Sequence, residues 1–185
     1  MTHAETILLA FDRHLTRETP LVLYGRAALV LGFSPPLADA VYSLDVDVIL
    51  PLEQSAALDN DPAFWEALAA ANLELDSTGL YLTHLFEEDQ VILRPNWKDH
   101  LVPISQPSFR FLRLYRPAAI DLLLTKMMRG PDPQDMADAA FLIRAGNLTS
   151  QEIRSTIAVA RIPAIPEIEE AFRAAIPIIL LKTER

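Results

Sequence analysis

Two aspartates, Asp45 and Asp47, stand two residues apart inside the apolar stretch YSLDVDVIL, residues 42–50. Side chains alternate between the two faces of a strand, so both carboxylates are expected on one face together with Ser43. Carboxylates this close repel each other unless a cation, water or a basic group lies between them. Mg²⁺ takes oxygen ligands and would in turn hold a nucleoside triphosphate. The alternative is an edge strand with a solvated outer face, although aspartate is uncommon in strands.

A glycine, Gly25, separates a predicted strand from a predicted helix in the stretch LVLYGRAALVLG, residues 21–32. Glycine permits a tight turn and a close approach of other groups to the backbone. The N–H groups at the start of the following helix favour an anion. Arg26 comes next; it either contacts a phosphate or fills the site and prevents nucleotide binding. A plain turn without a ligand is the simpler alternative for Gly25.

The apolar pattern predicts a mixed α/β portion followed by a helical portion. Helices are expected at residues 3–15, 26–33 and 61–72. Strands are expected at residues 20–25, 42–50, 101–104 and 109–115. After Pro117 the pattern is helical throughout. We therefore expect an α+β fold, with a mixed β-sheet and flanking helices in residues 1–116 and a helical C-terminal part packed on it in residues 117–185.

The segment between the helix at 61–72 and the strand at 101–104 is expected to form a β-hairpin. Residues 80–86 and 91–93 are rich in β-formers and are joined by the charged connection EEDQ. A third carboxylate that would complete a metal site is not evident in this segment. Glu74 and Asp76 share one face of a further candidate strand, and His84 falls on the apolar face of residues 80–86.

The glycine turn and the Asp-x-Asp strand about 20 residues after it resemble the nucleotidyltransferase superfamily, whose palm is like that of polymerase β. The stretch PAAIDLLLTKMMRGPDPQDMADAAFLI, residues 117–143, is similar to the segment after the palm in AbiEii-like nucleotidyltransferases, many of them toxin components. There a lysine on one helix precedes an acidic pair at the start of the next. The matching residues here are Lys126, Asp135 and Asp138, and the resemblance covers residues 21–142.

The resemblance implies a nucleotidyltransferase-like sheet with Mg²⁺ held by Asp45 and Asp47 and with Lys126 in a catalytic role. It implies a nucleotide-binding set made of Gly25, Arg26, Ser43, Lys126, Arg129, Asp135 and Asp138. The chain departs from the family at Arg26, where the family turn usually has a second glycine or a serine.

The residues after position 117 also have simpler readings. Lys126 and Arg129 lie three apart on one helix face, where they could hold phosphate as point charges or lie in solvent. Asp135, near the start of the next helix, suits the helix dipole without any ligand. Asp138 lies on the same face and could pair with Lys126 or Arg129 and fix their orientation.

The amino-acid composition of the chain excludes or disfavours several classes of protein. The chain has 185 residues, a formal net charge of -9 and no cysteine, which excludes a disulfide framework and a cysteine-based zinc site or nucleophile. The negative net charge disfavours a protein that coats nucleic acid through bulk electrostatic attraction. Lys and Arg are absent between Arg26 and Arg94 and enriched from Arg94 to Arg129. This pattern favours an acidic segment that binds cations followed by a basic segment that binds an anion. No basic leader or membrane-length apolar run is visible, so we expect a cytoplasmic protein with no membrane partner.

The sequence favours an Mg²⁺-dependent nucleotidyltransferase that transfers a nucleotidyl group from an NTP to an RNA or protein hydroxyl. A toxin–antitoxin or phage-defence system with a partner protein from a second gene is the expected setting. The alternative is a catalytically degenerate relative that uses the same fold as a binding or regulatory module. A third reading is self-association through the apolar stretch AAIPIILLK, residues 174–182, which is otherwise expected to pack on its own domain.

Overall fold

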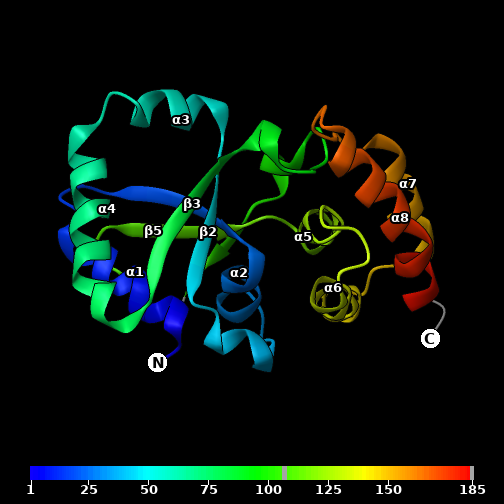
Figure 1. The fold of residues 1–185 in the computed structure, drawn as a ribbon, viewed down its shortest axis with the longest axis horizontal. Coiled ribbons are helices and arrows are strands. Elements are labelled where there is room, and N and C mark those ends of the chain that lie inside the picture. The colour runs from blue at the N-terminus through cyan, green and yellow to red at the C-terminus, as the bar shows by residue number, and fades with distance from the viewer. Residues whose placement is uncertain (106–107, 184–185) are drawn as a thin grey trace. The chain divides into compact units, whose positions relative to one another are not determined.

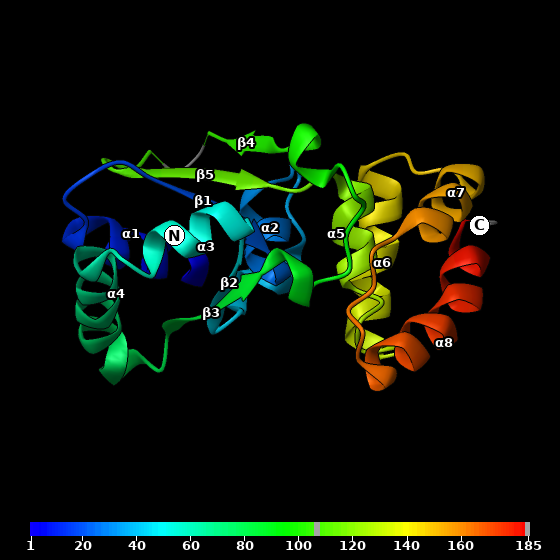
Figure 2. The same ribbon diagram turned by 90° about the horizontal axis from the view of Figure 1, so that it is seen from above.

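The computed structural model describes residues 1–105 and 108–183, except for the side chains of Thr83 and His84. These residues form eight α-helices and a five-stranded mixed sheet, so the expected α+β class is confirmed (Figure 1, Figure 2). The chain divides into two compact units. The first comprises Met1–Glu87 and Val102–Arg116, and the second comprises Glu88–Leu101 and Pro117–Arg185.

The sheet belongs to the first unit, and its strands follow the order β3-β2-β1-β5-β4. The bounds of the strands are Thr19–Tyr24 (β1), Asp45–Leu50 (β2), Tyr81–Glu87 (β3), Val102–Ile104 (β4) and Leu112–Arg116 (β5). β1 pairs with β5 and β2 pairs with β3 in parallel, whereas the pairs β1–β2 and β4–β5 are antiparallel. The strand with the two aspartates therefore lies inside the sheet, between β1 and β3.

The helices of the first unit cover the sheet and carry clear start signals in the sequence. They are α1 (His3–His14), α2 (Gly25–Leu31), α3 (Leu52–Leu58) and α4 (Pro62–Leu75). Thr2 and Glu5 form a capping box at the start of α1, and Asp61 caps α4 ahead of Pro62. The two helices pack together through the rings of Phe11 and Phe64, which meet edge to face at 5.5 Å. Both helices also contact β2 or β3.

Two local predictions in the first unit differ from the structure. Helix α3 was not expected; it begins directly after Pro51. Helix α4 continues through Leu75, so Glu74 is helical, and Asp76 begins a short 3-10 turn rather than lying on a strand. Alanines earlier in α4 favour the helical conformation, and the helix continues through Leu75. The alternating pattern of the last residues, taken alone, indicated a strand.

The predicted hairpin is wrong. β3 pairs in parallel with β2, whereas residues 91–93 form no strand with it. Leu93 instead makes an isolated antiparallel bridge with Arg161, and the segment Glu88–Leu101 belongs to the second unit. The buried Glu88 fixes this segment, because its carboxylate accepts hydrogen bonds from the Trp97 indole at 2.8 Å and from Lys98 at 3.1 Å.

The second unit is helical apart from the segment Glu88–Leu101. Its helices are α5 (Ala119–Thr125), α6 (Pro133–Ala145), α7 (Ser150–Val159) and α8 (Pro166–Lys182). The chain enters the second unit twice, after Glu87 and again after Arg116. A buried ion pair links the segment to α5: the fully buried Asp121 accepts hydrogen bonds from Arg94 Nε at 2.9 Å and Arg94 Nη2 at 2.6 Å.

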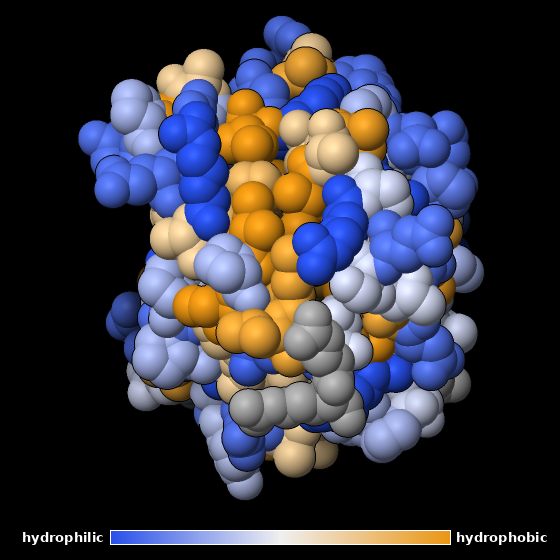
Figure 3. All heavy atoms as spheres, turned by 90° about the vertical axis from the view of Figure 1, so that its right-hand side faces the viewer, coloured by the Kyte–Doolittle hydropathy of each residue, from blue (hydrophilic) through white to orange (hydrophobic). Residues whose placement is uncertain are grey.

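Helix α8 contains the apolar stretch for which two roles were considered. Phe172, Ala175 and Ile179 are buried within the second unit, as expected for packing on its own domain. Leu181 remains 61% exposed. Figure 3 shows a band of apolar side chains on the face that contains α7 and α8. No helix in residues 1–105 or 108–183 combines the length and apolar character needed to cross a bilayer.

Candidate functional site

The two aspartates of β2 lie on one face of the strand. Asp45 and Asp47 are half-buried, whereas Val46 and Val48, which alternate with them, are fully buried. The valines drive this orientation because their burial in the core fixes the opposite face for the acids. Ser43 supports the first acid, since its hydroxyl donates a hydrogen bond to Asp45 Oδ1 at 2.9 Å.

Gly25 is in direct contact with the second aspartate. Its φ of +60° lies in the left-handed region, which side chains other than glycine rarely adopt. A Cβ atom added at Gly25 would lie 2.6 Å from Asp47 Oδ2, far inside any normal contact. The turn between β1 and α2 therefore requires glycine for two reasons: the backbone conformation and the approach of the Asp47 carboxylate. Arg26, the next residue, is half-buried at the start of α2.

Tyr24 is a site residue that sequence reasoning missed. The antiparallel register places it directly opposite Asp47, so both side chains point to the same face of the sheet. Burial, together with the charges of Asp47 and Asp45, raises the pKa of the Tyr24 hydroxyl above its usual range. The ring of Tyr24 meets Phe86 of β3 edge to face at 5.7 Å. Its place before the glycine was visible in the sequence, but its partner depends on strand register.

The β2–β3 pairing contains an irregularity next to the aspartates. Asp45 lies opposite Tyr81 and Val46 opposite Leu82, but the register then shifts so that Asp47 lies opposite His84. His84 was expected on the same face as Leu82, a prediction about its side chain. The side chain of His84 lies outside the described residues. A bulge of this kind often redirects side chains near functional sites.

The other candidates for a third carboxylate lie elsewhere. Glu74 on α4 forms ion pairs with Arg13 and His14 of α1. Asp76 lies in the 3-10 turn after α4. Within the part of the chain that the structure describes, no group of three or more His, Cys, Asp or Glu side chains is arranged to hold a metal ion.

The pair of aspartates nevertheless has the donor chemistry that Mg²⁺ requires. Two half-buried carboxylates and the Ser43 hydroxyl present oxygen atoms on one face. The glycine without a Cβ leaves the Asp47 carboxylate room beside the turn. Mg²⁺ commonly binds one or two carboxylates and keeps several waters or phosphate oxygens as its remaining ligands. The oxygen donors of these residues therefore fit the ion.

The predicted residues of the second unit form one ionic network. Lys126 is buried, and its Nζ lies 3.1 Å from Asp135 Oδ1 and 2.7 Å from Asp138 Oδ2. Arg129 Nε contacts the other oxygen of Asp135 at 2.6 Å. This hydrogen bond raises the pKa of Arg129. Asp132 caps α6 by accepting from the backbone N–H of Asp135.

The network explains why these residue types occur together in the second unit. The expected pairing of Asp138 with Lys126 is present. Asp135 also stands in the first turn of α6, as its role at the helix start requires. Lys126 pairs with two carboxylates in a buried environment, so removal of its charge would break the pair with Asp138 and leave Arg129 as the cation beside Asp135. The main role of the network is therefore to stabilise the second unit.

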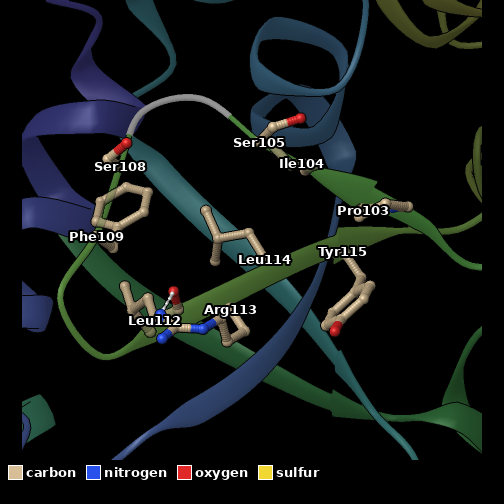
Figure 4. Close-up of a pocket in the computed structure, with 9 residues that line it drawn as sticks. All are labelled: Pro103, Ile104, Ser105, Ser108, Phe109, Leu112, Arg113, Leu114 and Tyr115. Carbon is tan, nitrogen blue, oxygen red and sulfur yellow. Dashed lines mark hydrogen bonds between the residues drawn. The ribbon is translucent and has the colours of Figure 1, made fainter.

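A separate pocket lies beside β4 and β5, which belong to the first unit (Figure 4). Its volume is about 270 Å³, and residues of the two strands and their connection line it, among them Ile104, Phe109 and Leu114. The predicted site residues are not among the described residues that line it. The only hydrogen bond drawn among the labelled side chains joins the Arg113 guanidinium to the Leu112 carbonyl, at 3.1 Å.

Comparisons with known proteins add no assignment. No known protein family has a model that matches the chain, and searches of curated proteins and of solved structures find no significant match. The class of protein that fold and site define is therefore an α+β protein with a mixed sheet and a carboxylate pair beside a glycine turn.

Proposed function

We propose that the chain is an Mg²⁺-dependent nucleotidyltransferase whose carboxylate pair, Asp45 and Asp47, holds the ion and the nucleoside triphosphate. One observation carries the proposal: the two acids share a face of β2, and the Asp47 carboxylate lies against Gly25 at the β1–α2 turn. Two carboxylates on one strand face repel each other, and a cation bound between them would relieve the repulsion and attract the phosphates of a nucleotide.

The reaction would depend on the positions of the reacting groups and on positive charge that stabilises the phosphate oxygens. The oxygen of an acceptor hydroxyl attacks the α-phosphorus, the bond from that phosphorus to the bridging oxygen breaks, and pyrophosphate leaves. The hydroxyl proton passes to a carboxylate oxygen of the pair. When bound, Mg²⁺ supplies positive charge against the developing charge on the phosphate oxygens. Ser43 holds Asp45 in place by its hydrogen bond, and Gly25 leaves space beside Asp47.

The remaining assignments are part of the same proposal. Arg26 would contact the phosphates from the start of α2. Contacts of Lys126 and Arg129 with phosphate stay a prediction, since both side chains already have carboxylate partners. The acceptor would be an RNA or protein hydroxyl, and a two-gene toxin–antitoxin or phage-defence system would supply the partner protein.

A second candidate function is a binding or regulatory module of the same fold without catalysis. Two observations favour it. Arg26 follows Gly25, where the resembled family has a small residue, and the backbone position opposite Asp47 on β3 is His84 rather than an acid. Such a protein would use the site for a ligand or a partner without transferring a nucleotidyl group.

Thermal unfolding with each NTP and Mg²⁺ tests the two candidates. A ligand that binds the folded state alone stabilises it by about 2.7 kcal/mol at 100 times its Kd. The enzyme hypothesis expects a rise in melting temperature with at least one NTP that Asp45→Ala and Asp47→Ala abolish. Asp59→Ala, at an exposed aspartate after α3, is the matched control and should keep the rise. Absence of any rise with all four nucleotides would contradict nucleotide binding and favour the module.

A further inference from the structure

Tyr81 lies directly beside the first aspartate. It is the first residue of β3, its position pairs with Asp45 on β2, and its backbone N–H donates to the Leu44 carbonyl at 3.1 Å. Paired residues on neighbouring strands point to the same face of a sheet, about 4.8 Å apart. The tyrosine ring and the Asp45 carboxylate therefore occupy adjacent positions on one face.

The pairing of β1 with β2 brings a second aromatic residue to the same group of positions. Asp47 has Tyr24 opposite it on β1, whereas Asp45 has Tyr81 opposite it on β3. The carboxylate pair is thus flanked by a tyrosine on each side. Their surroundings differ: Tyr24 is half-buried and packs against Phe86, whereas the side chain of Tyr81 is 37% exposed.

Two further exposed large residues stand next to Ser43 and Asp45 in the chain: Tyr42 is 74% exposed and Leu44 is 53% exposed. The Leu44 carbonyl accepts the hydrogen bond from the backbone N–H of Tyr81. Tyr81 is therefore an exposed aromatic residue at the end of β3 that begins beside the first aspartate.

We propose that Tyr81 is a stacking platform for a nucleobase at this site. The inference rests on the proposed function and adds where the base lies. A tyrosine ring offers a flat apolar face to any base, and its hydroxyl stays in water. A phosphate held at the carboxylates leaves the rest of the nucleotide within reach of a ring on the next strand. The base belongs either to the donor nucleotide or to the acceptor strand.

Substitutions at Tyr81 separate stacking from simple apolar contact. Tyr81→Phe keeps the ring, Tyr81→Leu keeps apolar surface without a ring, and Tyr81→Ala removes both. The Kd of the full-length protein is measured by calorimetry for each NTP with Mg²⁺ and, in a second arm, for a short single-stranded RNA. Stacking on one aromatic side chain changes affinity by about fivefold to 150-fold. Melting temperatures confirm that each variant folds.

Each outcome decides the proposal. Weaker nucleotide binding in the Leu and Ala variants, with Phe unchanged, places the base of the donor on Tyr81. The same pattern with RNA alone places a base of the acceptor there. If the wild type binds nucleotide or RNA and the Leu variant binds as tightly, the platform is refuted while the proposed function stands. If the wild type binds neither ligand, both proposals fail.

Discussion

The contact between Gly25 and Asp47 yields a quantitative prediction about Gly25→Ala. Two costs arise at this position. A left-handed backbone costs about 1–2 kcal/mol for alanine, since φ is +60°. The new Cβ would also stand 2.6 Å from Asp47 Oδ2, so the carboxylate must rotate away. A side chain forced about 30° from its rotamer costs ~0.5–1.5 kcal/mol. We expect Gly25→Ala to lower the free energy of unfolding by roughly 2–3 kcal/mol.

Gly79→Ala is the matched control for the backbone cost. Gly79 has a similar φ of +70°, and no atom lies within 4 Å of an added Cβ. Its cost should therefore be the backbone strain alone, about 1–2 kcal/mol. Urea unfolding of both variants, monitored by circular dichroism, measures the two free energies.

A double-mutant cycle isolates the carboxylate. In an Asp47→Ala background the close contact no longer exists, so Gly25→Ala should cost no more than Gly79→Ala. An interaction energy of about 1 kcal/mol between the two positions is expected. An equal cost of Gly25→Ala in both backgrounds would refute the placement of Asp47 against the glycine turn.

Two further predictions follow from buried polar groups. Lys126→Met breaks the buried ion pair with Asp138 and leaves Arg129 as the cation beside Asp135, and it should destabilise the protein by about 3–5 kcal/mol; Arg173→Met, in the exposed pair with Glu169, should cost less than about 1 kcal/mol in the same urea assay. The raised pKa of Tyr24 favours its neutral form in the folded state, so its contribution to stability is complete below about pH 10, the ordinary pKa of tyrosine, and is lost as pH rises above it. Tyr24→Phe should flatten that alkaline loss, and an equally steep loss in the variant would contradict the buried position of the hydroxyl.

Local signals in the sequence predicted much of the fold. Asp61 and Asp132, each followed by proline, are local start signals, and both cap the helices that begin there, α4 and α6. Alternation predicted Asp45 and Asp47 on one face, and the structure agrees because Val46 and Val48, which alternate with them, are buried in the core. These features depend on residues within a few positions of each other, which a sequence displays directly.

Features that depend on distant partners were not predictable from one sequence. The β-rich run at residues 80–86 is compatible with a hairpin and with a parallel strand, since a hydrophobic pattern does not identify the neighbouring strand. The register shift after Val46, which decides what lies opposite Asp47, leaves no trace in hydrophobic alternation. The positions of Tyr24 and Tyr81 beside the aspartates follow from the pairing of β2 with β1 and with β3, and therefore required the structure.

Paramagnetic broadening by Mn²⁺ tests the central claim most directly, because Mn²⁺ replaces Mg²⁺ at oxygen sites and broadens the signals of nearby nuclei. The NMR spectrum of the backbone amides of the isotope-labelled protein is recorded during titration with Mn²⁺ in the presence of ATP, CTP, GTP or UTP. The account predicts that broadening begins at the backbone amides of Gly25 and Val46 and disappears in Asp47→Asn. Broadening centred elsewhere, or unchanged in that variant, would contradict a cation site at the carboxylate pair.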